Sequence, residues 1–339
     1  MSAATELLHN LSSPPVLCFT LGFGARVLKS DLRLPEALAQ GLSIYLLLAI
    51  GLKGGASISG GGEGIWGGLA ATLVLAFAIP LWTYGATRRF GGLRRAESAS
   101  IAAHYGSTSA VTFLATLAFL DAKGDPADGF MTALLAVMEV PAILVGLLFA
   151  GRAKGADEAE AAGRKPGATG GGGSIGAALW PVVSGKTVAL LLGGMVIGWI
   201  SGPAGKEAVA PFFVAPFTGV LCLFLLDLGR VTADRLDDLW RNARFLLPLG
   251  IVAPIVHGAL GVAAGHLVGL STGSATALGI LAGSASYIAA PAAMQVARPD
   301  VNHGLALAAS LCVTFPFNLT LGIPLLHWLS RFIEERGLL

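Results

Sequence analysis

The sequence predicts an all-α polytopic membrane protein with ten transmembrane helices, arranged as a 5+5 inverted repeat that contains two broken, crossing helices. Hydrophobic residues make up 54% of the 339 residues and charged residues only 12%, whereas a soluble domain carries about 25% charge. Apolar runs that approach the roughly 20 residues needed to cross the hydrocarbon core recur along the chain. Two similar motifs, rich in glycine and hydroxyl groups, lie inside two of these runs.

The apolar runs form two sets of five on either side of a hydrophilic segment. The first set spans residues 14–29, 35–53, 65–87, 98–121 and 130–151, and the second spans 179–200, 208–228, 243–267, 273–297 and 304–329. Segment 152–178 contains basic residues and then four consecutive glycines, a composition typical of a flexible linker. We therefore expect a first repeat at 1–151, a linker at 152–178 and a second repeat at 179–339.

A spacing of 177 residues relates the two halves. It carries the motif Gly106–Ser109 of the fourth span onto Gly283–Ser286 of the ninth, and it carries Lys53 onto Arg230. Each half has an odd number of spans, so the second copy must enter the membrane from the opposite face. Most lysine and arginine residues lie on the same side as the linker, which predicts a cytoplasmic linker and both termini outside.

Glycine and hydroxyl residues interrupt the fourth span at Gly106–Thr112 and the ninth at Gly283–Ala289. Glycine weakens a helix locally, and Pro291 lacks a backbone donor. Unwound backbone at membrane depth is tolerated only where it is buried in protein or lines a cavity. Two facing breaks would offer amide donors to an anion and oxygen atoms to a small cation, which is the arrangement of a transport site. Close packing of helices through small residues is the alternative.

We expect ions to bind where the two interrupted helices meet. The candidate residues are Gly106, Ser107, Thr108, Ser109, Ala110 and Thr112 in the first break, and Gly283, Ser284, Ala285, Ser286 and Tyr287 in the second. Glu139, Thr314 and Asn318, polar residues of the fifth and tenth spans, complete the set. An ionisable group at this depth is a functional candidate because its burial is costly unless it is paired. Hydrogen bonding between packed helices is the alternative role for these three.

The basic residues lie in short loops, so the formal net charge of +2 does not indicate nucleic-acid binding. The histidines show neither an i, i+4 pair nor HExxH spacing, and Gly-x-Ser-x-Gly is absent around the serines of the breaks. We therefore expect a transporter and not an enzyme.

Three segments resemble the sodium-dependent bicarbonate symporters of the SbtA type: Tyr105–Phe113, Gly283–Met294 and Val313–Pro324. The resemblance covers essentially the whole chain. It implies a fold related to the sodium/proton antiporters and bile-acid symporters, in which a core domain with the broken helices moves against a gate domain. It also implies a homotrimer in the plasma (inner) membrane of a bacterium, surrounded by membrane lipid, and a PII-like regulatory protein on the cytoplasmic face.

The residues and the resemblance together predict a secondary active transporter that takes up bicarbonate with sodium by alternating access. Sodium is the coupling ion, expected within the set Ser109, Ser286, Glu139 and Asn318, and we expect no cofactor. A sodium-coupled transporter of another small anion and a cation/proton exchanger of the same fold are the alternatives. Exchangers of this architecture usually place acidic residues beside the broken helices, and these two runs contain none.

Overall fold

The computed structural model describes residues 10–59, 64–161, 186–240, 242–297 and 304–338, and all regular structure in these ranges is helical. Six helices there are long and apolar enough to cross a membrane. The chain is therefore an all-helical, polytopic membrane protein, as the sequence predicts.

The helices of the first half follow the predicted spans closely. They are α2 (Pro14–Val27), α3 (Glu36–Ile58), α4 (Ile65–Phe90), α5 (Arg95–Gly106), α6 (Ala110–Lys123) and α7 (Met131–Ala161). The fourth predicted span is divided into α5 and α6, so neither piece is long enough to cross the hydrocarbon core alone. α7 continues to Ala161, ten residues into the predicted linker. The remainder of that linker lies outside the described residues.

The second half repeats the pattern of long and broken helices. Its elements are α9 (Lys186–Phe213), α10 (Phe217–Ala233), α11 (Leu236–Trp240), α12 (Ala243–Leu267), α13 (Thr272–Gly283), α14 (Ala289–Ala297), α15 (Gly304–Ala308) and α17 (Ile323–Arg336). Between α15 and α17 the helix widens into two π-helical segments, η1 (Ala309–Thr314) and η2 (Asn318–Gly322), on either side of α16 (Phe315–Phe317).

We expected the sixth span to end at residue 200, and two helical stretches of α9 meet just after it at Gly202, whose backbone is not helical. Helical structure then resumes and continues to Phe213, where we expected a loop near residues 201–207. Gly202 has a positive φ of 62°, which a glycine adopts without steric cost, so the turn there is a kink inside the helix. The seventh span consequently begins at Phe217, nine residues later than expected.

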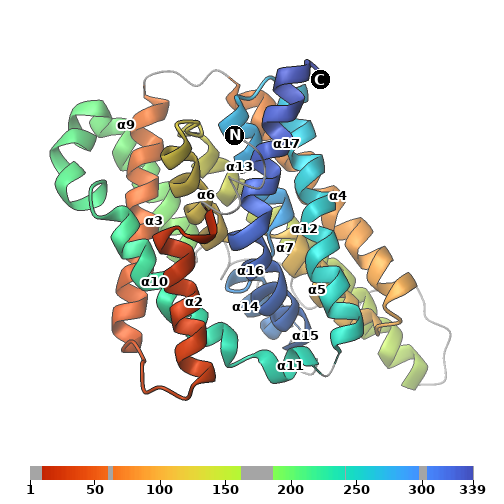
Figure 1. Ribbon diagram of the computed structural model, residues 1–339. Coiled ribbons are helices and arrows are strands. Elements are labelled where there is room, and N and C mark those ends of the chain that lie inside the picture. The colour runs from red at the N-terminus through yellow and green to blue at the C-terminus, as the bar shows by residue number, and fades with distance from the viewer. Residues whose placement is uncertain (1–9, 60–63, 162–185, 241, 298–303, 339) are drawn as a thin grey trace.

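Four helices form a group of their own, which we call the four-helix group: α2 packs against α10, and α3 packs against α9. In Figure 1 these helices lie on the left of the molecule. Glycines allow their backbones to approach closely, because a Cβ at Gly22 would lie 1.8 Å from the Leu226 carbonyl oxygen of α10. In the other pair, a Cβ at Gly55 would lie 2.0 Å from the Met195 carbonyl oxygen of α9. Such small-residue contacts are typical of membrane helix pairs.

The remaining helices form a second group, the inner group, around the short helices α5 and α13. Every residue of α13 is buried, and it packs against α12, α17 and α6. α5 is buried from Ser98 to Gly106 and packs between α4 and α7. The two short helices have the same length of 12 residues. Their first residues, Arg95 and Thr272, and their last residues, Gly106 and Gly283, are both 177 positions apart.

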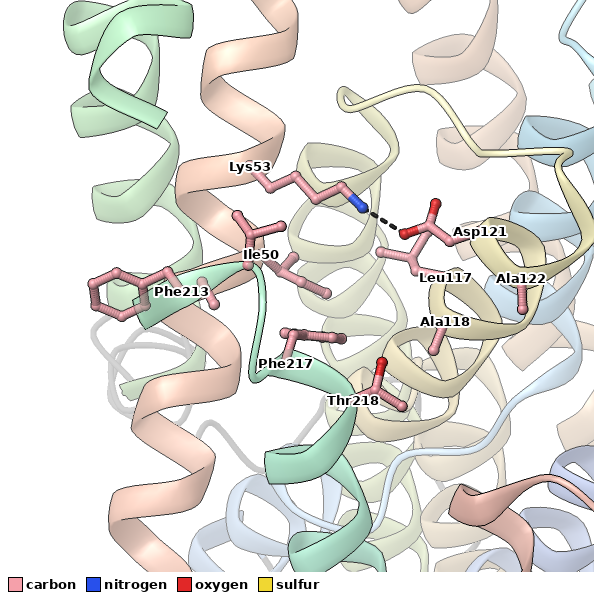
Figure 2. Close-up of a pocket in the computed structure, with 11 residues that line it drawn as sticks. Ile50, Lys53, Leu117, Ala118, Asp121, Ala122, Phe213, Phe217 and Thr218 are labelled. Atoms are coloured by element: carbon pink, nitrogen blue, oxygen red, sulfur yellow. Dashed lines mark hydrogen bonds and ion pairs between the residues drawn. The ribbon is translucent and has the colours of Figure 1, made fainter. Parts of the chain in front are cut away.

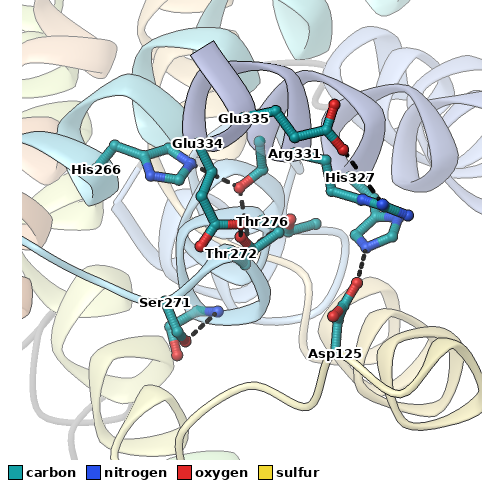
Figure 3. A network of polar contacts seen from close by, with 11 residues as sticks. Asp125, His266, Ser271, Thr272, Thr276, His327, Arg331, Glu334 and Glu335 are labelled. Carbon is teal, nitrogen blue, oxygen red and sulfur yellow. Dashed lines mark hydrogen bonds and ion pairs between the residues drawn. The ribbon is translucent and has the colours of Figure 1, made fainter. Parts of the chain in front are cut away.

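A polar network holds the start of α13 against α12 and α17 (Figure 3). The Ser330 hydroxyl of α17 donates to the Thr272 carbonyl at 3.0 Å and lies 2.8 Å from His266 Nε2 of α12. Nearby, His327 Nε2 lies 2.9 Å from a carboxylate oxygen of Asp125, in the loop after α6. These contacts fix the position of α13, and therefore of the break that follows it.

Candidate functional site at the crossing of the broken helices

The first break begins where α5 ends at Gly106. Ser107 has extended backbone (φ −88°, ψ 162°), so the chain leaves the helix there. Gly106 lies directly on the ring of Pro80 in α4, because a Cβ at Gly106 would be 2.7 Å from the Pro80 Cβ. The chain re-enters a helix at α6, whose N-cap is Ser109. The Ser109 hydroxyl oxygen accepts from the Thr112 backbone N–H at 3.1 Å and from the Thr112 hydroxyl at 2.8 Å.

The second break has nearly the same geometry. α13 ends at Gly283, and Ser284 has extended backbone (φ −93°, ψ 172°) like that of Ser107. Gly283 lies against α12, because a Cβ there would be 2.6 Å from the Pro254 carbonyl oxygen. The Ser286 hydroxyl oxygen accepts from the Ala290 backbone N–H at 3.2 Å, at the start of α14. In each break, therefore, a serine binds the first turn of the helix that follows.

Hydrogen bonds join the two breaks directly. The Ser109 backbone N–H donates to the Ser284 hydroxyl oxygen at 3.0 Å, and the Thr108 and Ser284 hydroxyl oxygens are 3.1 Å apart. The Ser286 backbone N–H donates to the His104 carbonyl oxygen at 2.8 Å. All these hydroxyl side chains are buried. The structure thus brings together the two segments that the sequence predicts to meet.

The widened helix of the tenth predicted span also reaches the crossing. The Asn318 side-chain amide donates to the Gly283 carbonyl at 2.9 Å, at the end of α13. One turn earlier, the Thr314 hydroxyl donates to the Gly250 carbonyl at 3.0 Å and accepts from the Tyr105 hydroxyl at 2.8 Å. Both residues lie in the π-helical segments, which occur frequently at functional sites.

Several buried oxygens at the crossing are left without a hydrogen bond. The Ser107 hydroxyl and the Asn318 side-chain carbonyl are both buried and have no partner among the described residues. The Tyr287 hydroxyl is buried and directed toward Ser109, but it forms no hydrogen bond of normal geometry. An unsatisfied buried polar atom costs about 1–3 kcal/mol, so these oxygens are candidates for binding an ion or a water molecule. These oxygens could coordinate a small hard cation.

The helix ends give the crossing opposite partial charges side by side. The C-terminal carbonyls of α5 and α13 carry partial negative charge, which favours a cation. The N-termini of α6 and α14 carry partial positive charge, which favours an anion. Within the described ranges, His, Cys, Asp and Glu do not gather in a group of three or more that could hold a metal ion. The groups that the described breaks present at the crossing are neutral oxygens and backbone dipoles.

Most of the predicted site residues lie at this crossing, but Glu139 is not joined to it by any described hydrogen bond or ion pair. Glu139 is buried in the middle of α7, which packs against α5 and α14. Ala110 and Ala285 lie at the breaks but have no polar side chain, so they can contribute only backbone groups to the site. From the sequence we did not expect Tyr105 or Gly250 to be partners of Thr314, although Tyr105 directly precedes the first break.

The sequence matches the family model described as the Na⁺-dependent bicarbonate transporter superfamily over residues 14–331. The match includes both breaks and the π-helical segments. A comparison with individually curated proteins gives no match. A family match over nearly the whole chain places this protein in the Na⁺-dependent bicarbonate transporter superfamily.

Proposed function

We propose that this protein takes up bicarbonate together with sodium, and that both ions bind at the crossing of α5–α6 with α13–α14. The observation that carries the proposal is the direct contact of the two breaks, with unpartnered buried oxygens at Ser107 and Asn318 beside it. Membership of the superfamily supports the choice of ions.

The two ions would use different parts of the crossing. Bicarbonate would accept hydrogen bonds near the N-termini of α6 and α14. Sodium would be coordinated by oxygens from the Ser107 and Asn318 side chains and from the ends of α5 and α13. The set proposed from the sequence is Ser109, Ser286, Glu139 and Asn318. Asn318 belongs to both sets, Ser109 and Ser286 also hold the following helices, and Glu139 of α7 stays a further candidate ligand for the cation.

The coupling of bicarbonate uptake to sodium follows from the opposite charges of the two ions. Inward movement of bicarbonate alone works against an inside-negative potential by about 2.3 kcal/mol per charge per 100 mV. One sodium ion cancels that charge, and the sodium gradient then drives uptake. If each ion stabilises the other at the crossing, each raises the affinity for the other by the same factor.

We infer that the two halves are inverted repeats of five spans each, and that the inner group moves against the four-helix group in alternating access. The matched bounds of α5 and α13 support the repeat, and so do α4 and α12, which end 177 residues apart at Phe90 and Leu267. A shift of 177 residues carries α2 onto residues 191–204 of α9 and α3 onto residues 213–235 around α10, so the repeat exchanges the α2–α10 contact with the α9–α3 contact. We also propose that the protein is a homotrimer in a bacterial plasma membrane, with a cytoplasmic linker and a PII-like regulator, as the charge distribution and the family resemblance imply.

The proposal is tested by uptake of labelled inorganic carbon at alkaline pH into proteoliposomes, with an inward gradient of either sodium or potassium. We expect uptake with sodium only. Ser107→Ala should raise the sodium concentration for half-maximal uptake by about tenfold, the effect of losing roughly 1.4 kcal/mol of binding. Ser98→Ala is the matched control, because the Ser98 hydroxyl is also buried without a partner in α5 but lies nine residues from the break. Equal uptake with potassium would contradict the proposal.

The burial of Glu139 favours a second candidate function, that of a cation/proton exchanger. It is a buried carboxyl group in the middle of a membrane-spanning helix, and such groups often carry protons or cations. Sodium-driven proton movement in the same proteoliposomes, without bicarbonate, would favour the exchanger over the symporter.

A further inference from the structure

A groove lies between α4 and α12, away from the crossing. It is an open cavity of about 720 Å³. Apolar side chains form most of its lining, among them Trp82 and Phe90 of α4 and Phe245, Leu249, Val252 and Val256 of α12. In Figure 1, α4 and α12 lie on the opposite side of the molecule from α9. The groove is therefore separate from the contact between the two helix groups.

The groove opens on the outer surface of the inner group. Trp82 is 42% exposed, Phe90 79% and Val252 55%. Both helices are long and apolar enough to cross a membrane, so these side chains face the lipid bilayer. The Trp82 indole N–H donates to His257 Nε2 at 2.8 Å, while His257 Nδ1 and the Thr83 hydroxyl are buried without a hydrogen-bond partner among the described residues. An apolar acyl chain is the occupant that suits these walls.

Two arginines lie at one end of the groove. Arg89 lines it directly, and Arg244 is exposed in the first turn of α12, one residue before Phe245. The end of α4 and the start of α12 lie together, because a Cβ at Gly91 would be 2.7 Å from the Phe245 ring. Neither arginine forms an ion pair with a described residue. From Trp82 to Arg89 the groove extends about 10 Å along α4, at 1.5 Å per residue.

We propose that this groove binds an anionic phospholipid, with its phosphate at Arg89 and Arg244 and an acyl chain along Trp82. Basic pockets between transmembrane helices bind anionic lipid head groups for the same electrostatic reason. The two guanidinium groups distinguish an anionic lipid from a zwitterionic one, and the apolar walls distinguish a lipid from a free phosphate ion. Because the groove belongs to the inner group alone, the bound lipid would stay with that group during transport.

The test is native mass spectrometry of the detergent-purified full-length protein, titrated with phosphatidylglycerol or with phosphatidylcholine of the same acyl chains. We expect the wild type to retain phosphatidylglycerol preferentially. Arg89→Gln and Arg244→Gln should each lower that retention about fivefold, in line with the typical contribution of one basic residue near an anionic membrane surface. Arg33→Gln is the matched control, because Arg33 is an exposed arginine in the loop between α2 and α3, outside the inner group.

A second variant tests the groove itself. Gly85 lines the groove, and a Cβ there would meet no atom within 4 Å, so Gly85→Leu places a larger apolar side chain in the groove from a position with open space for the Cβ. We expect it to lower the retention of both lipids. Gly41→Leu is its control, because Gly41 also has open space around it but lies on α3. Equal retention of the two lipids by the wild type would overturn the proposal, and so would unchanged retention in Arg89→Gln, Arg244→Gln and Gly85→Leu proteins whose thermal unfolding matches the wild type.

Discussion

Lys53 Nζ of α3 lies 2.6 Å from a carboxylate oxygen of Asp121 in α6, so one ion pair joins the four-helix group to the inner group. Figure 2 shows the pair at the edge of a cavity of about 280 Å³, which Phe213 and Phe217 also line. The Lys53 and Asp121 side chains are 40% and 46% exposed, so the pair contributes at most about 1 kcal/mol to stability. The ion pair matters because it connects the two helix groups, so any movement of one group against the other must break or stretch it.

The first prediction concerns this ion pair. Asp121→Asn should change the rate of sodium-driven uptake by up to about fivefold, because a pair worth ~1 kcal/mol biases the conformational equilibrium by that factor. The thermal unfolding temperature should change by less than about 3 °C, which corresponds to less than 1 kcal/mol for a chain of this size. The initial rate of uptake into proteoliposomes tests the first part, and thermal unfolding of the protein in detergent tests the second.

The exchange variant Lys53→Asp/Asp121→Lys restores a pair of opposite charges and should return the uptake rate toward that of the wild type. Lys123→Gln is the control for loss of charge at the same end of α6, since Lys123 contacts Phe119 of its own helix instead of the four-helix group. A rate change in Lys123→Gln equal to that in Asp121→Asn would show that general surface charge, not the ion pair, sets the rate.

The second prediction concerns Gly322, which leaves room for the Asn318 side chain. A Cβ at Gly322 would lie 2.4 Å from Asn318 Oδ1, so Gly322→Ala must displace the Asn318 side chain, and we expect this to weaken its hydrogen bond to the Gly283 carbonyl. We expect a loss of about 1–3 kcal/mol in the free energy of unfolding, from the buried groups that lose their partners. Sodium affinity should fall as well. Chemical unfolding and the sodium dependence of uptake measure the two effects.

Gly41→Ala is the control, because alanine there meets no atom within 4 Å and improves helix propensity. It should leave stability unchanged or slightly higher. If Gly322→Ala retains wild-type sodium affinity, Asn318 does not serve the cation, and its role is confined to holding the end of α13.

Local motifs explain why the two breaks could be predicted from the sequence. Gly106 and Gly283 end their helices, and the serines that follow are suited to extended backbone and helix capping, so residue type alone indicates both features. The contact between the two breaks could be predicted only because the motif is repeated. Each break leaves backbone polar groups without helical partners inside the membrane, and a second break at the same depth can supply partners for them.

Long-range partners could not be predicted in the same way. The Tyr105–Thr314 and Asn318–Gly283 hydrogen bonds link residues 209 and 35 positions apart, and no local pattern specifies them. The π-helical widening around Phe315 has no sequence signature that we used. The backbone at Gly202 is not helical, so a break there agrees with the expected end of the sixth span, but the sequence did not indicate that helical structure resumes and continues to Phe213.

The third prediction separates the packing role of Thr314 from a role as an ion ligand. Thr314→Val removes both of its hydrogen bonds and leaves the Gly250 carbonyl and the Tyr105 hydroxyl without partners. Tyr105→Phe removes one bond and keeps the other. We expect Thr314→Val to be less stable than Tyr105→Phe by about 1–2 kcal/mol in chemical unfolding. Both should keep the sodium affinity of the wild type, because both hydroxyls are already satisfied within the protein. A tenfold loss of sodium affinity in Thr314→Val alone would instead identify Thr314 as a ligand.

The last prediction concerns Glu139, whose carboxyl group is buried in α7 without an ion pair or hydrogen bond among the described residues. Burial of an uncompensated carboxylate is unfavourable, so a cation bound during transport is the partner we expect for it. Glu139→Gln keeps the shape and removes the charge. It should increase stability in the absence of sodium and raise the sodium concentration for half-maximal uptake about tenfold, which corresponds to roughly 1.4 kcal/mol. Glu207→Gln, on the exposed surface of α9, is the control and should change neither quantity. An unchanged sodium dependence in Glu139→Gln would exclude Glu139 from the cation site and leave the neutral oxygens of the crossing as its ligands.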